Sequence, residues 1–397
     1  MNLLQDKLNV TQKKRSNIFN WRGQFTPEFV EYILQSYTKI GDLVVDPFSG
    51  SGTVMQEAAN LKLSAIGFEI NPAAYAMSKF FSFCNLSLSI RYEIINSFEV
   101  KLNVFLKNLN GEIIFIDNPD YRQAYSGLIS FGEKISKELD KTEKILLLNI
   151  LFLSEKDKKM TVKQSILRSY SYIRNKFIGL SFTDYPIKAI LADAREVGHI
   201  LRESADLILT SPPYINVFNY HQNYRALVEI FNFDILKVAN SEFGSNRKNR
   251  GNRFKTVVQY TIDMEQAITG FWYGLKLNAY LILVIGRQSN VRSIAFYNSQ
   301  IVIDIVNEMR GFDLINIIER QFVNKFGNNI KEDLLIYKKN SNLINGQFGR
   351  EIAKKHLENN LLLSRDDIKT DLEEAIKCVF QIDPSPIFNS NQIIYLQ

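Results

Sequence analysis

The sequence predicts an α/β fold with a doubly wound, mostly parallel sheet of about seven strands and a largely helical insertion. Three observations carry this prediction. A strand–loop–helix–strand pattern spans residues 42–70, the same rhythm resumes at 187–214, and two apolar segments within 312–339 are placed to close the sheet as a hairpin. Between the first two stretches, residues 85–186 break the pattern with helical, basic and aromatic segments.

The first pattern can be followed element by element. Thr26-Pro27 is a favourable helix start, and the apolar spacing of Phe29, Ile33 and Leu34 predicts a helix that ends at Gly41. The following segments predict a short buried strand, a tight loop, a helix, a second strand and a further helix, over residues 42–46, 47–52, 53–61, 64–70 and 71–81. Later in the chain, residues 279–286 predict another buried strand and residues 298–309 another helix.

The composition indicates a chain that forms a large core. Of its 397 residues, 46% are hydrophobic, and the net charge of +6 permits an anionic partner such as nucleic acid. Cys84 and Cys378 are the two cysteines; they predict neither a disulfide framework nor a metal site, so we expect a reducing compartment. Because no apolar run is long enough to cross a membrane, we expect a cytoplasmic protein without membrane partners.

A glycine loop, residues 47–52, lies between the first predicted strand and its helix. Gly50 and Gly52 let the backbone approach a ligand closely, and Glu69 ends the next strand, where a carboxylate can hold the hydroxyls of a ribose. The loop therefore predicts a nucleoside-containing cofactor. Met55 stands where the dinucleotide fingerprint requires a small residue, and no Lys-Ser/Thr pair of a P-loop follows. A plain tight turn is the simpler alternative.

A proline corner, Ser211-Pro212-Pro213-Tyr214, ends a predicted apolar strand. Ligands of open α/β sheets bind at the carboxyl ends of the strands. The serine hydroxyl and the backbone carbonyls are hydrogen-bond acceptors and the tyrosine adds a flat ring, a combination that suits an extruded nucleobase with an exocyclic amine. The corner contains no cysteine that could attack a pyrimidine ring. A proline-stiffened turn is the alternative without function.

Four motifs in this order, "DPFSGSGT", "GFEINP", "ADARE" and "TSPPY", resemble those of the amino-group DNA methyltransferases that use S-adenosylmethionine. The leading segment "NWRGQFTPEFVEYIL" resembles a further cofactor motif of that family. The resemblance covers roughly residues 20–84 and 187–340 and implies the Rossmann-like methyltransferase fold.

The resemblance also implies roles for individual residues. The predicted cofactor contacts are Phe25, Thr26, Pro27, Asp46, Pro47, Phe48, Ser49, Gly50, Gly52 and Thr53 toward the methionine part, Glu69 with Ile70 at the ribose, and Asp193 with Ala194 at the adenine. The predicted catalytic residues, which would grip the target base, are Ser211, Pro212, Pro213 and Tyr214.

The implied function is methyl transfer to double-stranded DNA at a specific sequence, in partnership with a restriction endonuclease. In the family a serine at the first corner position usually accompanies the N4 amine of cytosine, so cytosine is expected, with the N6 amine of adenine as the alternative. Less expected are methylation of RNA or protein and a non-catalytic binding module. A nicotinamide oxidoreductase is disfavoured by Met55.

The sequence suggests two regions that read DNA. One is a basic loop, residues 245–255, with the candidate contacts Arg247, Lys248, Arg250, Arg253 and Lys255; a solvated charged loop is the alternative. The other is the insertion, for which a structural cap is the alternative. We therefore expect a catalytic domain formed by residues 1–84 and 187–340, a recognition insertion at 85–186, and a helical tail at 341–397.

Overall fold

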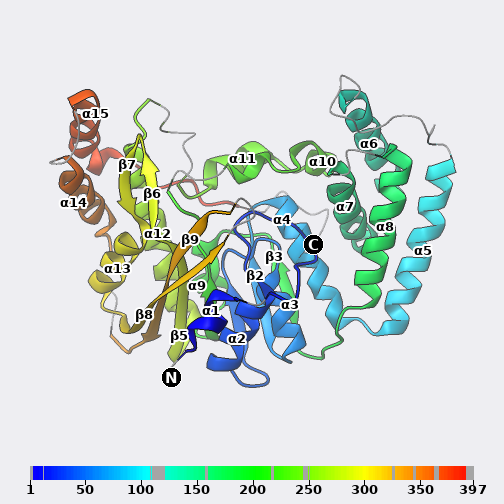
Figure 1. The fold of residues 1–397 in the computed structure, drawn as a ribbon, viewed down its shortest axis with the longest axis horizontal. Helices are drawn as coiled ribbons and strands as arrows, with labels where there is room; N and C mark the ends of the chain where they lie inside the picture. Colours follow the sequence, from blue (N-terminus) through cyan, green and yellow to red (C-terminus); the bar gives the residue numbers. More distant parts are fainter. Residues whose placement is uncertain are drawn as a thin grey trace.

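The sheet expected from the sequence is present in the computed structural model, and it has seven strands in the order β3-β2-β1-β4-β5-β9-β8 (Figure 1). The structure describes residues 3–11, 13–107, 109, 121–156, 160–215, 219–244, 249, 251–323, 327–342, 346–361 and 366–389. The prediction of a doubly wound, mostly parallel sheet is confirmed.

Five strands run parallel: β1 (Leu43–Asp46), β2 (Ser64–Phe68), β3 (Ile187–Ile190), β4 (Ala205–Thr210) and β5 (Leu275–Gly286). The antiparallel hairpin of β8 (Phe312–Val323) and β9 (Asn329–Lys339) extends the sheet from β5, as predicted. The chain winds outward from β1 to β3 and then restarts at β4 beside β1. The carboxyl ends of β1 and β4 therefore border the switch point at which such sheets bind ligands.

Alternation along the strands divides the core into two layers. Leu207 and Leu209 of β4 face one hydrophobic cluster, whereas Ile208 between them faces the other. The first layer includes α2 (Pro27–Tyr37), α3 (Thr53–Asn60) and α4 (Pro72–Lys79). The second includes α12 (Lys255–Gly274), α13 (Asn298–Met309) and α14 (Gly349–Leu361). Each face of the sheet is thus covered by helices.

The insertion is helical, with α5 (Leu88–Lys107), α6 (Tyr121–Ser136), α7 (Lys141–Glu155) and α8 (Val162–Ile178). Capping boxes start two of these helices: Asp140 pairs with Glu143 at α7, and Thr161 pairs with Gln164 at α8. The four helices form one end of the molecule, while α14 and α15 (Asp366–Lys377) lie at the other (Figure 1).

Short elements join these parts. They are α1 (Gln5–Asn9), α9 (Val197–Ile200), α10 (Arg225–Glu229), α11 (Ile235–Ser241) and a hairpin of β6 (Gln288–Val291) and β7 (Ile294–Tyr297). The sequence did not predict the hairpin. Short 3₁₀ turns occupy residues 80–85, 194–196, 220–222 and 379–381. Among the described helices, none combines the length and apolarity needed to cross a membrane.

Candidate functional site

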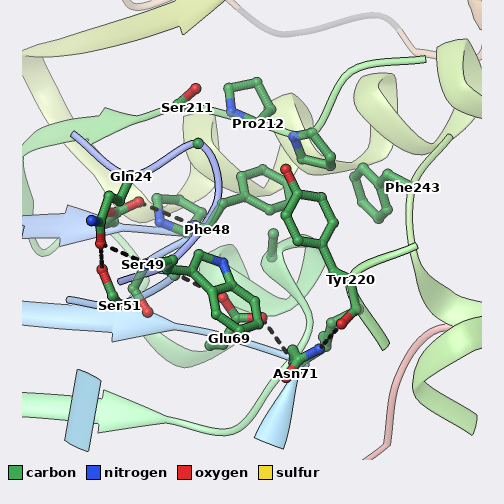
Figure 2. A pocket seen from close by; sticks show the side chains of 18 of the residues that line it. Gln24, Phe48, Ser49, Ser51, Glu69, Asn71, Ser211, Pro212, Tyr220 and Phe243 are labelled. Carbon is green, nitrogen blue, oxygen red and sulfur yellow. Dashed lines mark hydrogen bonds between the residues drawn. The ribbon is translucent and has the colours of Figure 1, made fainter. Parts of the chain in front are cut away.

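A pocket lies at the carboxyl ends of β1, β2, β3 and β4, beside the switch point. Its walls come from segments far apart in the sequence: residues 21–25, 46–51, 53, 69–71, 192–194, 211–214, 220 and 242–243. Figure 2 shows Ser211 and Pro212 at one edge of this pocket and Glu69 and Asn71 at the other. The glycine loop and the proline corner therefore face a common space.

The glycine loop is tied to the end of β2. Gly50 has a positive φ of 50°, and its N–H donates to Oε2 of Glu69 at 2.9 Å. The N–H of Asn71 donates to Oε1 of the same carboxylate at 2.8 Å. Each oxygen thus accepts one backbone N–H and retains room for a further donor, so Glu69 suits a ligand with two neighbouring hydroxyls.

Burial raises the pKa values of two carboxyl groups at this end of the pocket. Loss of hydration raises the pKa of Glu69 to about 7, against the opposing effect of its two backbone hydrogen bonds. Burial likewise raises the pKa of Asp46 to about 7, although the Thr210 hydroxyl at 2.6 Å and the Phe48 N–H at 3.1 Å donate to its carboxylate. Two carboxyl groups that titrate near neutrality therefore lie beside the glycine loop.

The proline corner is held rigidly on β4. The ring of Tyr214 packs against Gly286 of β5 so closely that a Cβ there would lie 2.6 Å from a ring carbon. The Tyr214 hydroxyl lies 3.4 Å from the Ser211 Oγ and donates to Oε1 of Glu332 at 3.4 Å. Burial raises the pKa of Tyr214 well above its ordinary value, so the phenol stays protonated. The Tyr214 hydroxyl therefore lies between the Ser211 hydroxyl and the partly buried carboxyl group of Glu332.

Aromatic side chains supply much of the remaining wall. Trp21 and Tyr220 stack at 6.0 Å between ring centroids, and Phe48 meets Phe243 edge-on at 5.4 Å. Tyr220 and Phe243 stand on the side of the pocket opposite Gln24 and Ser51 (Figure 2). These rings offer faces on which a flat heterocycle can stack.

Sequence reasoning missed several lining residues: Trp21, Arg22, Gly23, Gln24, Ser51, Asn71, Ala192, Tyr220, Glu242 and Phe243. A signal existed for Trp21 and Gln24, which lie in the quoted motif segment, where Gln24 accepts the Ser51 hydroxyl at 2.6 Å. Glu242 and Phe243 follow α11 outside any motif. Only the fold brings them to the pocket, where Glu242 bonds the ring of His221 at 2.6 Å.

Most predicted cofactor residues line the pocket, namely Phe25, Asp46, Pro47, Phe48, Ser49, Gly50, Thr53, Glu69, Ile70, Asp193 and Ala194, together with all four residues of the proline corner. Thr26, Pro27 and Gly52 do not. Thr26 and Pro27 form the start of α2. Gly52 starts α3 at a φ of 87° and packs against α4, since a Cβ there would lie 2.8 Å from the Ser78 Cα. These three residues therefore position the helices next to the pocket and do not line it themselves.

The predicted DNA contacts have different outcomes. Arg247, Lys248 and Arg250 lie outside the described residues. Arg253 is exposed, whereas Lys255 forms an ion pair with Glu374 of α15 at 2.6 Å. Within the described ranges, no group of three or more His, Cys, Asp or Glu side chains could hold a metal ion.

Comparison with known proteins shows similarity to DNA methyltransferases, most specifically in the N-terminal part of the chain. A family model described as DNA methylase, of the N6/N4 type, matches residues 4–80. The type II methyltransferase M.MjaII of Methanocaldococcus jannaschii is 34% identical over 67 residues, covering 16% of this chain and 13% of that protein. M.BsoBI of Geobacillus stearothermophilus is 23% identical over 278 residues, covering 57% of this chain and 55% of that protein. The chain thus spans about half of the second relative and much less of the first.

Solved structures resemble the chain more distantly. A SAM-dependent methyltransferase of Methanosarcina mazei is 11% identical with a TM-score of 0.36, covering 78% of this chain and 97% of that one. An rRNA methylase of Streptococcus thermophilus is 11% identical with a TM-score of 0.33, covering 80% and 98%. The match to the family model is the more specific finding: residues 4–80 are similar to the N6/N4 DNA methylases, and the relatives that match are type II methyltransferases.

Proposed function

We propose that the chain transfers a methyl group from S-adenosylmethionine to the exocyclic N4 amine of cytosine in double-stranded DNA. The observation that carries this proposal is the shared pocket: the glycine loop with Glu69 and the proline corner with Ser211 line one space at the switch point of the sheet. A nucleoside cofactor and an extruded base both need such a space, and transfer requires them to meet.

The residues present fit S-adenosylmethionine, which is the cofactor of this family. Glu69 keeps acceptor capacity for the ribose hydroxyls, because only one N–H occupies each of its oxygens. Asp46 places a second carboxyl group beside the loop, and its negative form favours a cation. The cofactor supplies an activated sulfonium methyl group, so the protein's task is alignment rather than activation.

The proline corner would hold the target amine. The Ser211 Oγ and the Pro212 carbonyl would accept its hydrogens, and the ring of Tyr214, fixed against Gly286, would present a face to the base. These hydrogen bonds would leave the nitrogen lone pair directed at the methyl group. The proton that the amine loses would pass from Ser211 through the Tyr214 hydroxyl to Glu332, the groups that these two contacts connect.

Serine at the first corner position supports cytosine as the target, and N6 of adenine is the alternative. The helical insertion, which lies beside α10 at one end of the molecule (Figure 1), and the basic loop, in which Arg253 is exposed, are proposed to read DNA. The relatives that match are type II methyltransferases. We therefore propose that a restriction endonuclease shares the recognition sequence of this chain.

The test is a transfer assay. The purified protein is incubated with methyl-labelled S-adenosylmethionine and DNA from cells that lack modification methyltransferases, and the DNA is then digested to nucleosides. We expect the label in N4-methylcytosine. Label in N6-methyladenine would contradict the choice of base, and label in RNA or protein substrates with none in DNA would contradict the proposed function.

A further inference from the structure

Asp193 lines the pocket at the position where the family resemblance implies a contact with the cofactor's adenine amine, yet its carboxylate is fully engaged within the protein. Oδ1 accepts the backbone N–H of Arg195 at 3.0 Å and the Arg195 Nε at 2.9 Å. Oδ2 accepts an Arg195 Nη at 2.6 Å and the backbone N–H of Phe388 at 3.0 Å. Each oxygen already accepts two hydrogen bonds, which is its ordinary capacity.

Glu69 provides the contrast within the same pocket. Each of its oxygens accepts a single backbone N–H, so a ribose hydroxyl can still donate to it. Asp193 has no comparable capacity, and only 1% of its surface is exposed. Its carboxylate therefore does not fit the role of accepting an amine from a bound cofactor.

The same carboxylate connects the pocket to the far end of the chain. The C-terminal strap, residues 383–389, passes beside Arg195, and this guanidinium donates to the carbonyl oxygens of Ser385 at 2.7 Å and Pro386 at 2.9 Å. The N–H of Ser385 donates to Asp263 of α12 at 2.8 Å. Asp263, Arg195 and Asp193 are all buried, so the strap is fixed by an enclosed network of charged groups.

The network also supports an aromatic wall of the pocket. The Arg195 guanidinium carbon lies 5.0 Å from the ring centroid of Phe243, which lines the pocket and meets Phe48 edge-on. Phe388 is buried and shares a small cavity with Pro72 of α4 and Val238 of α11. Through Asp193 and Arg195, the strap therefore supports two segments that line the pocket, residues 192–194 and 242–243.

We propose that Asp193 is a positioning residue, and that together with Arg195 it uses the C-terminal strap to shape the adenine end of the cofactor pocket. This inference rests on the proposed function, because it concerns the same cofactor. It assigns the strap, a segment with no recognisable motif, to the cofactor site. The adenine would be held by the shape and the aromatic rings of the wall, without a hydrogen bond from its amine to Asp193.

The test measures binding of two nucleosides by calorimetry: S-adenosylhomocysteine and S-inosylhomocysteine, in which an oxygen replaces the adenine amine. The variants are Asp193→Asn and a deletion of residues 383–397, with a deletion of residues 390–397 as the matched control that keeps the strap. In Asp193→Asn, the side-chain amide would point its own N–H groups at the N–H donors of Arg195 and Phe388, which the carboxylate accepts in the wild type. We expect both variants to bind both nucleosides about tenfold or more weakly, with the ratio between the two affinities unchanged, and the control to bind like the wild type.

Circular dichroism and the unfolding midpoint without ligand establish that each variant is folded. If Asp193→Asn reduced only the preference for the adenine compound and the strap deletion bound normally, Asp193 would be a direct adenine ligand and the inference would be overturned. Wild-type protein that bound neither nucleoside would contradict the proposed function itself, whereas normal binding by both variants would overturn the positioning role alone.

Discussion

Asp46 is buried and Glu69 is partly buried, and we expect the protonation of these two carboxyl groups to affect how the pocket binds a cofactor. Burial raises the pKa of each to about 7, so both are largely protonated in mildly acidic solution. A protonated carboxyl group offers fewer acceptor positions and no negative charge. The ribose and the sulfonium are therefore expected to bind the ionised forms.

The affinity for S-adenosylmethionine should consequently fall as the pH is lowered through 7. A single proton released on binding gives at most about a tenfold change in Kd per pH unit. Calorimetry from pH 8 to pH 6 measures the slope, and Glu69→Gln, which cannot titrate, should show weaker binding with a shallower slope. A Kd that stays constant over this range would contradict the roles given to the two carboxylates.

The stability of the unliganded protein should depend on pH in the opposite direction and should fall as the pH rises. Because Asp46, Glu69 and Asp263 have raised pKa values in the folded state, the folded chain binds more protons than the unfolded chain between about pH 4 and 7. Their contribution is complete at low pH and is lost as the pH rises to 7. Each group should contribute about 1.4 kcal/mol per pH unit in this window. Denaturant unfolding without ligand should therefore give a larger free energy at pH 5.5 than at pH 7.5, and the reverse order would contradict the pKa shifts.

The glycine loop and α3 show how one residue positions an element. Gly52 has a φ of 87°, and a Cβ there would lie 2.7 Å from a ring carbon of Phe81 and 2.8 Å from the Ser78 backbone. Gly52→Ala should therefore lower the free energy of unfolding by about 2 kcal/mol or more and weaken cofactor binding. Gly346→Ala is the control, since its Cβ meets no atom within 4 Å. Denaturant titration of both variants checks this, and equal stability of the two would contradict the packing role.

The elements that the sequence predicted carry local signals. Thr26-Pro27 marks the start of α2, the glycine loop marks the junction of β1 and α3, and the two prolines mark the end of β4. The β6–β7 hairpin was not predicted because its turn uses Arg292 and Ser293 at positive φ, without the glycine or asparagine that usually signals such a turn.

The same distinction holds for the site. Strand ends and motif order were enough to predict that Glu69 and Ser211 lie at the pocket, because their positions depend on the chain beside them. Phe243 could not be predicted in this way, since tertiary packing alone brings it to the pocket. Asp193 was found by its motif, but its partners include Phe388, at a sequence distance that no local pattern encodes.

For the whole molecule, the exposure of its basic side chains bears on how DNA would be bound. Arg253 in the basic loop is exposed, whereas Lys255 is held by Glu374 of α15. If Arg253 contacts phosphate, Arg253→Gln should weaken DNA binding and reduce the slope of log affinity against log salt by about 1. Fluorescence anisotropy at several salt concentrations measures this. Lys39→Gln, which removes an exposed charge just before the amino end of β1, is the control, and equal slopes for the two variants would remove Arg253 from the interface.

The central claim is that two segments far apart in the sequence act at one pocket, Glu69 on the cofactor and Ser211 on the base. Single-turnover methyl transfer to DNA, measured against cofactor concentration, separates these roles. Glu69→Gln should need more cofactor yet approach the wild-type rate at saturation. Ser211→Ala should bind cofactor normally and transfer about a hundredfold more slowly at any concentration. Ser204→Ala, just before the amino end of the same strand, should behave as the wild type. Transfer by Ser211→Ala at the wild-type rate would contradict the account.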